Sequence, residues 1–158
     1  MVLKGARQVG KTWLMKEFGQ ACYEHSVYFN FDEEDDLKSI FEVNKNPQRI
    51  IELLSLIAGE KILPGETLVI FDEIQECPAA LNALKYFKEK ANEYHIISAG
   101  SLLGTLLAQP KSYPVGMVNL LDLSPLMTNF WRLWNLLYMS FTAVSRRSSL
   151  LRRFSTAV

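Results

Sequence analysis

Short runs of apolar residues alternate along the chain with longer segments in which apolar residues recur at helical spacing. The short runs are bounded by turn residues and predict β-strands. They lie at residues 1–3, 26–31, 67–71, 94–99 and 118–123. The segments between them predict helices after residue 12, at 37–43, at 47–58, from 78 onward and at 102–108. This alternation predicts an α/β fold, in which a parallel β-sheet carries helices on both faces.

The apolar positions also predict which side of each helix is buried. In the first helical segment, the expected buried side chains are Trp13, Leu14, Phe18 and Cys22. In the segment at 47–58, they are Ile50, Leu53, Leu54 and Ile57. Both sets recur at the spacing of an amphipathic helix, so we expect them to pack against the sheet.

The most informative stretch lies between the first predicted strand and the first predicted helix. Its sequence is Gly5-Ala6-Arg7-Gln8-Val9-Gly10-Lys11-Thr12. It fits the phosphate-binding pattern G-x-x-x-x-G-K-[ST] at every fixed position. Glycine permits the tight bend that brings backbone N–H groups together at a helix N-terminus, where negative charge is stabilised. A chance glycine-rich turn is the alternative, and the acidic motif described next argues against it.

This loop predicts a site for the phosphates of a nucleotide and for a metal ion. Lys11 is expected to reach the β- and γ-phosphates of ATP, and the Thr12 hydroxyl is expected to bind Mg²⁺. The backbone around both residues is expected to contact the phosphates. The predicted nucleotide-binding residues are Gly5, Ala6, Arg7, Gln8, Val9, Gly10, Lys11, Thr12 and Trp13.

Two acids, Asp72 and Glu73, follow the apolar run at 67–71. Such a run predicts a strand buried on both faces of a parallel sheet. Carboxylates are unfavourable in a dry core, so we expect both at the sheet edge where ligands of α/β proteins bind. Asp72 is expected to hold Mg²⁺ through its water shell, and Glu73 to act as the general base that polarises the attacking water.

Three further polar features leave alternatives open. Ser98 and Ser101 are equal candidates for contacting the γ-phosphate, and either could instead be a satisfied turn hydroxyl. The acidic run at 32–36 predicts a solvated loop in which Asp35 or Asp36 caps the next helix, with a metal site as the alternative. His95 is expected to be a structural histidine.

The composition excludes few functions. The chain has 158 residues and a formal net charge of zero, which gives no general attraction to nucleic acid. Cys22 and Cys77 match no metal-ligand spacing, so a reduced cytoplasmic setting is expected. No signal peptide and no membrane association are predicted, because Arg7 and Arg132 interrupt the two main apolar stretches.

The sequence resembles the prokaryotic AAA-type ATPases that carry a GARQVGKT loop and an FDEIQ motif. Here these strings are residues 5–12 and 71–75, and further matching strings lie at 84–87, 95–104 and 113–116. The resemblance covers residues 1–126, and implies a P-loop NTPase fold, ATP binding, Mg²⁺ dependence and hydrolysis. Members of the family have a helix and more strand before the loop, and usually continue into a separate C-terminal domain. We therefore expect residues 1–126 to be an N-terminally clipped ATPase domain.

Two features depart from the family pattern. In the family, a basic residue commonly follows the glycine equivalent to Gly116, and this chain has Met117 there. If that positive charge stabilises the transferred phosphate, the substitution predicts weaker ATP hydrolysis. In residues 127–158 the only charged residues are arginines. Our hypothesis for this tail is out-of-frame translation from near Met127 or Thr128, because a two-base shift of possible codons gives a family-like sequence. A basic amphipathic segment for membrane or nucleic acid is the alternative.

Three functions remain open from the sequence. The first is an ATPase in which Lys11, Thr12, Asp72 and Glu73 surround Mg-ATP. The second is a regulatory module that is gated by the nucleotide and hydrolyses little of it. The third is an inert fragment of such a protein. Beyond the C-terminal domain of longer relatives, the sequence supports no particular protein or nucleic-acid partner.

Overall fold

The structure is a computed structural model that describes residues 1–101, 119–123, 135 and 139. In this part of the chain, five parallel strands form one sheet in the order β2-β3-β4-β1-β5. The strands are β1 (Val2–Gly5), β2 (His25–Asn30), β3 (Thr67–Asp72), β4 (His95–Gly100) and β5 (Leu120–Leu123). The helices are α1 (Lys11–Cys22), α2 (Asp35–Val43), α3 (Pro47–Ala58) and α4 (Pro78–Lys90), and a 3₁₀ helix, η1 (Ile74–Glu76), follows β3. The predicted α/β fold is confirmed.

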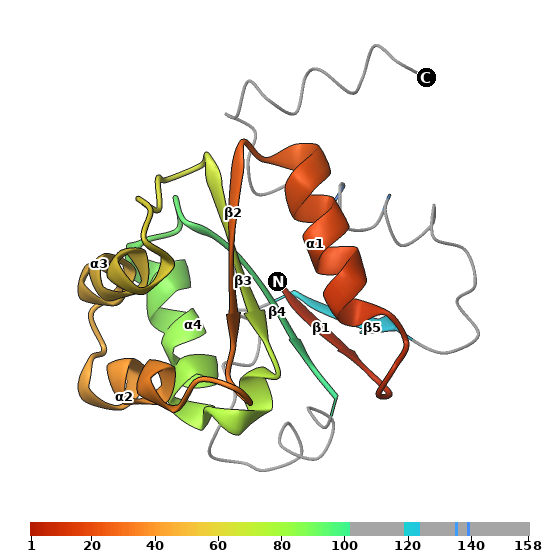
Figure 1. The fold of residues 1–158 in the computed structure, drawn as a ribbon, viewed down its shortest axis with the longest axis horizontal. Helices are drawn as coiled ribbons and strands as arrows, with labels where there is room; N and C mark the ends of the chain where they lie inside the picture. Colours follow the sequence, from red (N-terminus) through yellow and green to blue (C-terminus); the bar gives the residue numbers. More distant parts are fainter. Residues whose placement is uncertain (102–118, 124–134, 136–138, 140–158) are drawn as a thin grey trace.

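Helices cover both faces of the sheet. Neighbouring residues of a strand point to opposite faces. On β3, Leu68 and Ile70 therefore pack in the hydrophobic cluster that contains α1, whereas Val69 and Phe71 pack in the cluster that contains α2, α3 and α4. Figure 1 shows α1 on one side of β2 and β3, with the other three helices grouped on the opposite side. All six residues of β3 are buried. The burial of residues 67–71 is as the apolar run predicts, whereas the burial of Asp72 was not predicted.

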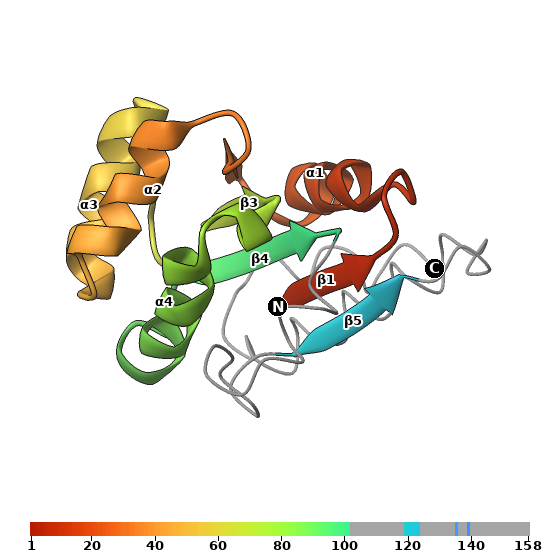
Figure 2. The same ribbon diagram turned by 90° about the horizontal axis from the view of Figure 1, so that it is seen from below.

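The sheet order brings the ends of β1 and β3 to one edge. Figure 2 shows β1 between β4 and β5, and β4 separates β1 from β3. Because the strands are parallel, the carboxyl ends of β1 and β3 point the same way. Gly5 ends β1 and Asp72 ends β3, so the loop and the two acids belong to the same edge of the sheet.

Strand packing requires glycine at position 5. Gly5 and Leu123 are register partners of β1 and β5. A Cβ atom on Gly5 would lie 2.4 Å from the carbonyl oxygen of Leu123, and the residue has a φ of +155°. A side chain here would collide with the backbone of β5. The first glycine of the loop is thus needed by the sheet as well as by the turn.

The structure corrects two of the predicted helix faces. In α1, Trp13 is 55% exposed and Met15 is buried, because the buried arc runs from Leu14 through Phe18 to Cys22 and excludes position 13. In α3, Ile57 is 45% exposed. The buried side of α3 is rotated away from Ile57, toward the residues Pro47, Ile50, Ile51 and Leu54.

Several predictions fall outside the described residues. These are the helix at 102–108, the role of Met117, the division after residue 126 and the interpretation of residues 127–158. They stay predictions. For the five strands, the predicted and observed ends agree within two residues.

Candidate functional site

The loop between β1 and α1 contains two residues with left-handed backbone. Gln8 has a φ of 61° and Gly10 a φ of 82°. Gly10 is the N-cap of α1, and no side chain caps this end of the helix. The N-cap glycine offers no side-chain acceptor to the first N–H groups of α1, and these groups together with the helix dipole favour an anion at this position.

Lys11 is folded back over this loop. Its Nζ atom donates hydrogen bonds to the carbonyl oxygens of Gly5 at 3.0 Å and Ala6 at 2.6 Å. Only 5% of the residue is exposed, and this burial lowers the pKa of Lys11, although the negative charges of Glu73 and Asp72 oppose the shift. The ammonium group is thus held by neutral partners at the edge where the two acids lie.

Asp72 joins three segments of the chain. Its Oδ2 atom accepts a hydrogen bond of 2.6 Å from the Thr12 hydroxyl and one of 3.0 Å from the Tyr28 hydroxyl. Its Oδ1 atom accepts a hydrogen bond of 3.0 Å from the backbone N–H of Glu73. Asp72 is 3% exposed, so these donors stabilise a carboxylate that has little access to water. The predicted Thr12 and Asp72 are therefore in direct contact.

Glu73 has a left-handed backbone, with a φ of 48° and a ψ of 43°. This conformation is unfavourable for a residue with a side chain, and such strain is often found at functional sites. The Oε2 atom of Glu73 accepts hydrogen bonds from the Gln75 side-chain amide and, at 3.2 Å, from the Ser101 hydroxyl. The carboxylate is thus held between η1 and the residue that follows β4.

The structure separates the two candidate serines. Ser98 is fully buried on β4, and in the described part of the chain its hydroxyl has no hydrogen-bond partner. It alternates with Ile97 and Ala99, which pack on the α1 side, so Ser98 points to the opposite face. Ser101 instead contacts Glu73. Only Ser101 is placed beside the acids, and its role toward a phosphate stays a prediction.

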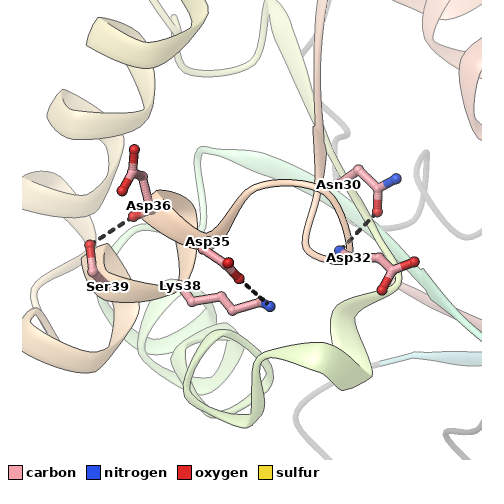
Figure 3. Close-up of polar contacts among 6 residues, drawn as sticks. All are labelled: Asn30, Asp32, Asp35, Asp36, Lys38 and Ser39. Carbon is pink, nitrogen blue, oxygen red and sulfur yellow. Dashed lines mark hydrogen bonds and ion pairs between the residues drawn. The ribbon is translucent and has the colours of Figure 1, made fainter.

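The acidic run after β2 does not converge on one point. Figure 3 shows the carboxylates of Asp32, Asp35 and Asp36 pointing in different directions, with Asp35 paired to Lys38 at 2.9 Å. Among the described residues, no group of three acids, histidines or cysteines could hold a metal ion. The predicted cap is also wrong. The helix α2 begins at Asp35, so Asp35 and Asp36 lie in its first turn and Glu34 is the N-cap. The Glu34 side chain makes no cap hydrogen bond.

His95 has a structural contact at the opposite edge of the sheet. Its Nδ1 atom lies 2.9 Å from the Tyr23 hydroxyl, and the two rings pack edge to face. His95 is the first residue of β4, whereas Lys11, Asp72 and Glu73 lie at the carboxyl edge of the strands. This position agrees with the predicted structural role.

Two residues beside the acids are absent from the sequence prediction. Tyr28 contacts Asp72 from β2, and Gln75 contacts Glu73 from η1. Burial and the neighbouring negative charge of Asp72 raise the pKa of Tyr28, which keeps its hydroxyl a donor. Gln75 follows Glu73 by two residues, and its Oε1 atom is buried without a hydrogen-bond partner in the described structure. The position of Gln75 two residues after Glu73 was the signal available for Gln75, whereas the sequence carries no signal for Tyr28, which lies 44 residues before Asp72.

A comparison of the sequence with protein-family models shows which family this chain belongs to. The sequence matches the AAA domain over residues 1–129. The chain belongs to the AAA domain family. It is therefore a nucleotide-binding domain of the AAA type. None of the curated proteins matches the sequence.

The AAA domain has its loop, its two acids and Ser101 at one edge of the sheet. The hydroxyl of Thr12 and the carboxylate of Asp72 are hard oxygen donors, which suit Mg²⁺. The uncapped N-terminus of α1 suits a phosphate. The residues present thus fit both groups. No helix in the described part of the AAA domain has the length and apolar character needed to cross a membrane.

Proposed function

We propose that this AAA domain binds ATP together with Mg²⁺ and hydrolyses it. The observation that carries the proposal is the hydrogen bond between Thr12 and Asp72. It joins the phosphate-binding loop to the acidic end of β3, so that a cation held there also lies beside a nucleotide in the loop. A metal-bound nucleotide is the ligand class that uses both parts at once.

The loop binds the phosphates through its backbone and through Lys11. Backbone N–H groups from Gly5 to Trp13 donate to the phosphate oxygens, and the left-handed backbone of Gly10 permits the turn from the loop into α1. Lys11 exchanges the carbonyl oxygens of Gly5 and Ala6 for the β- and γ-phosphates. This exchange is favourable because hydrogen bonds between two charged groups are stronger than those to neutral carbonyls.

Thr12 and Asp72 hold the metal ion. The Thr12 hydroxyl oxygen would bind the ion and can still donate its proton to Asp72, and the Asp72 carboxylate would hold the ion through its water shell. When bound, Mg²⁺ neutralises negative charge on the β- and γ-phosphate oxygens. The burial of Asp72 strengthens its interaction with a cation, because little water screens the charges.

Glu73 accepts the proton of the water that attacks the γ-phosphate. Its carboxylate follows Asp72 directly in the chain and is held by the Ser101 hydroxyl at 3.2 Å. The Ser101 hydroxyl has one proton, so when ATP is bound it would donate to a γ-phosphate oxygen in place of the Glu73 carboxylate. Ser101 thereby connects the state of the nucleotide to the position of the general base.

The test is ATP turnover of the wild type and of Glu73→Gln, with Glu76→Gln as the matched control. Glu76 is an exposed acid in η1, three residues further along. We expect Glu73→Gln to lower kcat by roughly 10²- to 10⁴-fold with ATP affinity retained, since general bases contribute on this scale. Glu76→Gln should keep wild-type turnover. Equal turnover in Glu73→Gln and the wild type would contradict the proposed role.

A nucleotide-gated module with little hydrolysis is the second candidate. The observation that favours it is that both Gln75 and Ser101 already occupy the carboxylate of Glu73. If the Glu73 carboxylate keeps these two hydrogen bonds, it is less available to accept a proton from a water molecule. ATP binding that depends on Mg²⁺, with equally low turnover in the wild type and Glu73→Gln, would support this module. A chain that binds no nucleotide at all would be an inert fragment.

A further inference from the structure

Tyr28 lies on β2 at a position that reaches Asp72. The register pairs Tyr28 with Ile70 and Asn30 with Asp72. Ile70 packs on the α1 side of β3, and Asp72, two residues further on, points to the same face. Tyr28 packs against the same cluster. A long aromatic side chain can therefore extend diagonally along this face to the carboxylate of Asp72.

The hydroxyl of Tyr28 completes the set of donors to Asp72. Thr12 donates to Oδ2 from α1, Tyr28 donates to the same oxygen from β2, and the Glu73 N–H donates to Oδ1. The final torsion of an aspartate is broad, so a carboxylate with one partner can rotate. Two donors from different elements, α1 and β2, on the same oxygen restrict that rotation. Tyr28 is the one of these three donors that belongs to neither motif.

The ring of Tyr28 is itself held in place. The Nζ atom of Lys16 lies 3.8 Å from the centroid of the ring, within the range of a cation–π interaction. Lys16 is four residues after Thr12 on α1 and lies on the same side of the helix. This contact ties the tyrosine of β2 to the helix that carries Thr12.

We propose that Tyr28 is a positioning residue for the Mg²⁺ site. Its hydroxyl fixes the carboxylate of Asp72 in the orientation in which Asp72 and Thr12 hold the metal ion together. This inference rests on the proposed function. Loss of a residue that orients a metal-binding carboxylate commonly weakens metal affinity by roughly 10- to 100-fold.

The test compares Tyr28→Phe with the wild type in the binding of ADP at increasing Mg²⁺, measured by calorimetry. Phenylalanine keeps the ring and the contact with Lys16 and removes only the hydroxyl. We expect the Mg²⁺ concentration that gives half of the metal-dependent gain in ADP affinity to rise about 10-fold. ADP affinity without Mg²⁺ should not change, and the melting temperature of the free protein should fall only slightly, because Thr12 and the Glu73 N–H still donate to Asp72. Tyr94→Phe is the matched control, because its hydroxyl contacts Gln48 at 3.4 Å, at the opposite edge of the sheet.

A double-mutant cycle shows whether Tyr28 acts through Asp72. In an Asp72→Asn background, Tyr28→Phe should leave the Mg²⁺ dependence unchanged, since the oriented group is already altered. An unchanged Mg²⁺ midpoint in Tyr28→Phe would overturn the inference. So would an equal loss of ADP affinity without Mg²⁺, or a markedly lower melting temperature, because either assigns Tyr28 to the fold. Failure of the proposed function gives a different result, namely a wild type whose ADP binding ignores Mg²⁺.

Discussion

The hydroxyl of Thr12 donates a hydrogen bond of 2.6 Å to the carboxylate of Asp72, across sixty residues of sequence. Thr12 is the second residue of α1 and Asp72 the last residue of β3. Strand β4 lies between β3 and β1 in the sheet, so this contact depends on the order β3-β4-β1. The contact places the Thr12 hydroxyl and the Asp72 carboxylate next to each other, beside the phosphate-binding loop.

Replacing Lys11 with methionine should weaken ATP binding without lowering the stability of the free protein. The variant lacks the charge-assisted hydrogen bonds from the lysine to phosphate, so we expect roughly a 100-fold weaker affinity for ATP. Burial lowers the pKa of Lys11, so its charged form is disfavoured in the free protein and methionine removes that cost. Calorimetry with ATP and a thermal melt measure the two effects.

The matched control for this change is Lys85→Met, which removes a lysine on α4 that lies 3.9 Å from Glu89. It should keep ATP affinity. A melting temperature that falls strongly in Lys11→Met would contradict the assignment, because it would make Lys11 a structural residue.

Gln75→Met should slow turnover while leaving ATP affinity unchanged. The Gln75 amide holds the carboxylate of Glu73, and its loss frees the general base to rotate. We expect kcat to fall about 10-fold, less than the roughly 100-fold effect of a misplaced catalytic group, because Ser101 still holds Glu73. Stability should change little, because the substitution also removes the buried Oε1 atom that has no partner in the described structure.

Steady-state kinetics of Gln75→Met and of Gln48→Met, an exposed glutamine on α3, measure this effect. If both variants have wild-type kcat, Gln75 does not position Glu73.

Two glycine-to-alanine variants separate strand packing from loop conformation. At Gly10, with a φ of 82° and no atom near a new Cβ, alanine should cost about 1 kcal/mol from the left-handed backbone alone. At Gly5, the collision with the Leu123 carbonyl adds to the backbone strain, so the loss should be about 3 kcal/mol. Denaturant unfolding gives both values. Equal losses would show that β5 does not approach Gly5 as closely as described.

His95 should make the fold less stable at mildly acidic pH. Burial lowers the pKa of His95 below its ordinary value of 6.5, so the unfolded chain binds the proton more readily than the folded chain. Its stabilising contribution is therefore complete above pH 6.5 and is lost as the pH falls from 6.5 through the lowered pKa. The free energy of unfolding at pH 7.5 and 5.5 should differ less in His95→Gln than in the wild type. His25→Gln, at an exposed histidine, should keep the wild-type difference.

The elements and the main site residues could be predicted because their signals are local. A buried strand shows as an apolar run, and Lys11, Thr12, Asp72 and Glu73 are specified by short spacings that need no knowledge of strand order. The roles of these residues stay predictions, whereas their proximity is a feature of the structure.

Tyr28 and Gln75 could not be found in this way. Tyr28 contacts Asp72 because β2 pairs with β3 in one particular register. The sequence of β2 alone does not show which strand it pairs with. Gln75 reaches Glu73 because η1 turns the chain directly after a left-handed residue. Trp13 shows the complementary error, since helical spacing alone does not fix which arc of α1 the sheet covers.

The affinity for ATP, measured with and without Mg²⁺ in the wild type and in Asp72→Asn, tests the central claim most directly. That claim is one site made by the loop and by the end of β3. We predict that Mg²⁺ strengthens ATP binding in the wild type, and that Asp72→Asn loses most of this gain while retaining the metal-free affinity. An equal effect of Mg²⁺ on both proteins would contradict the account.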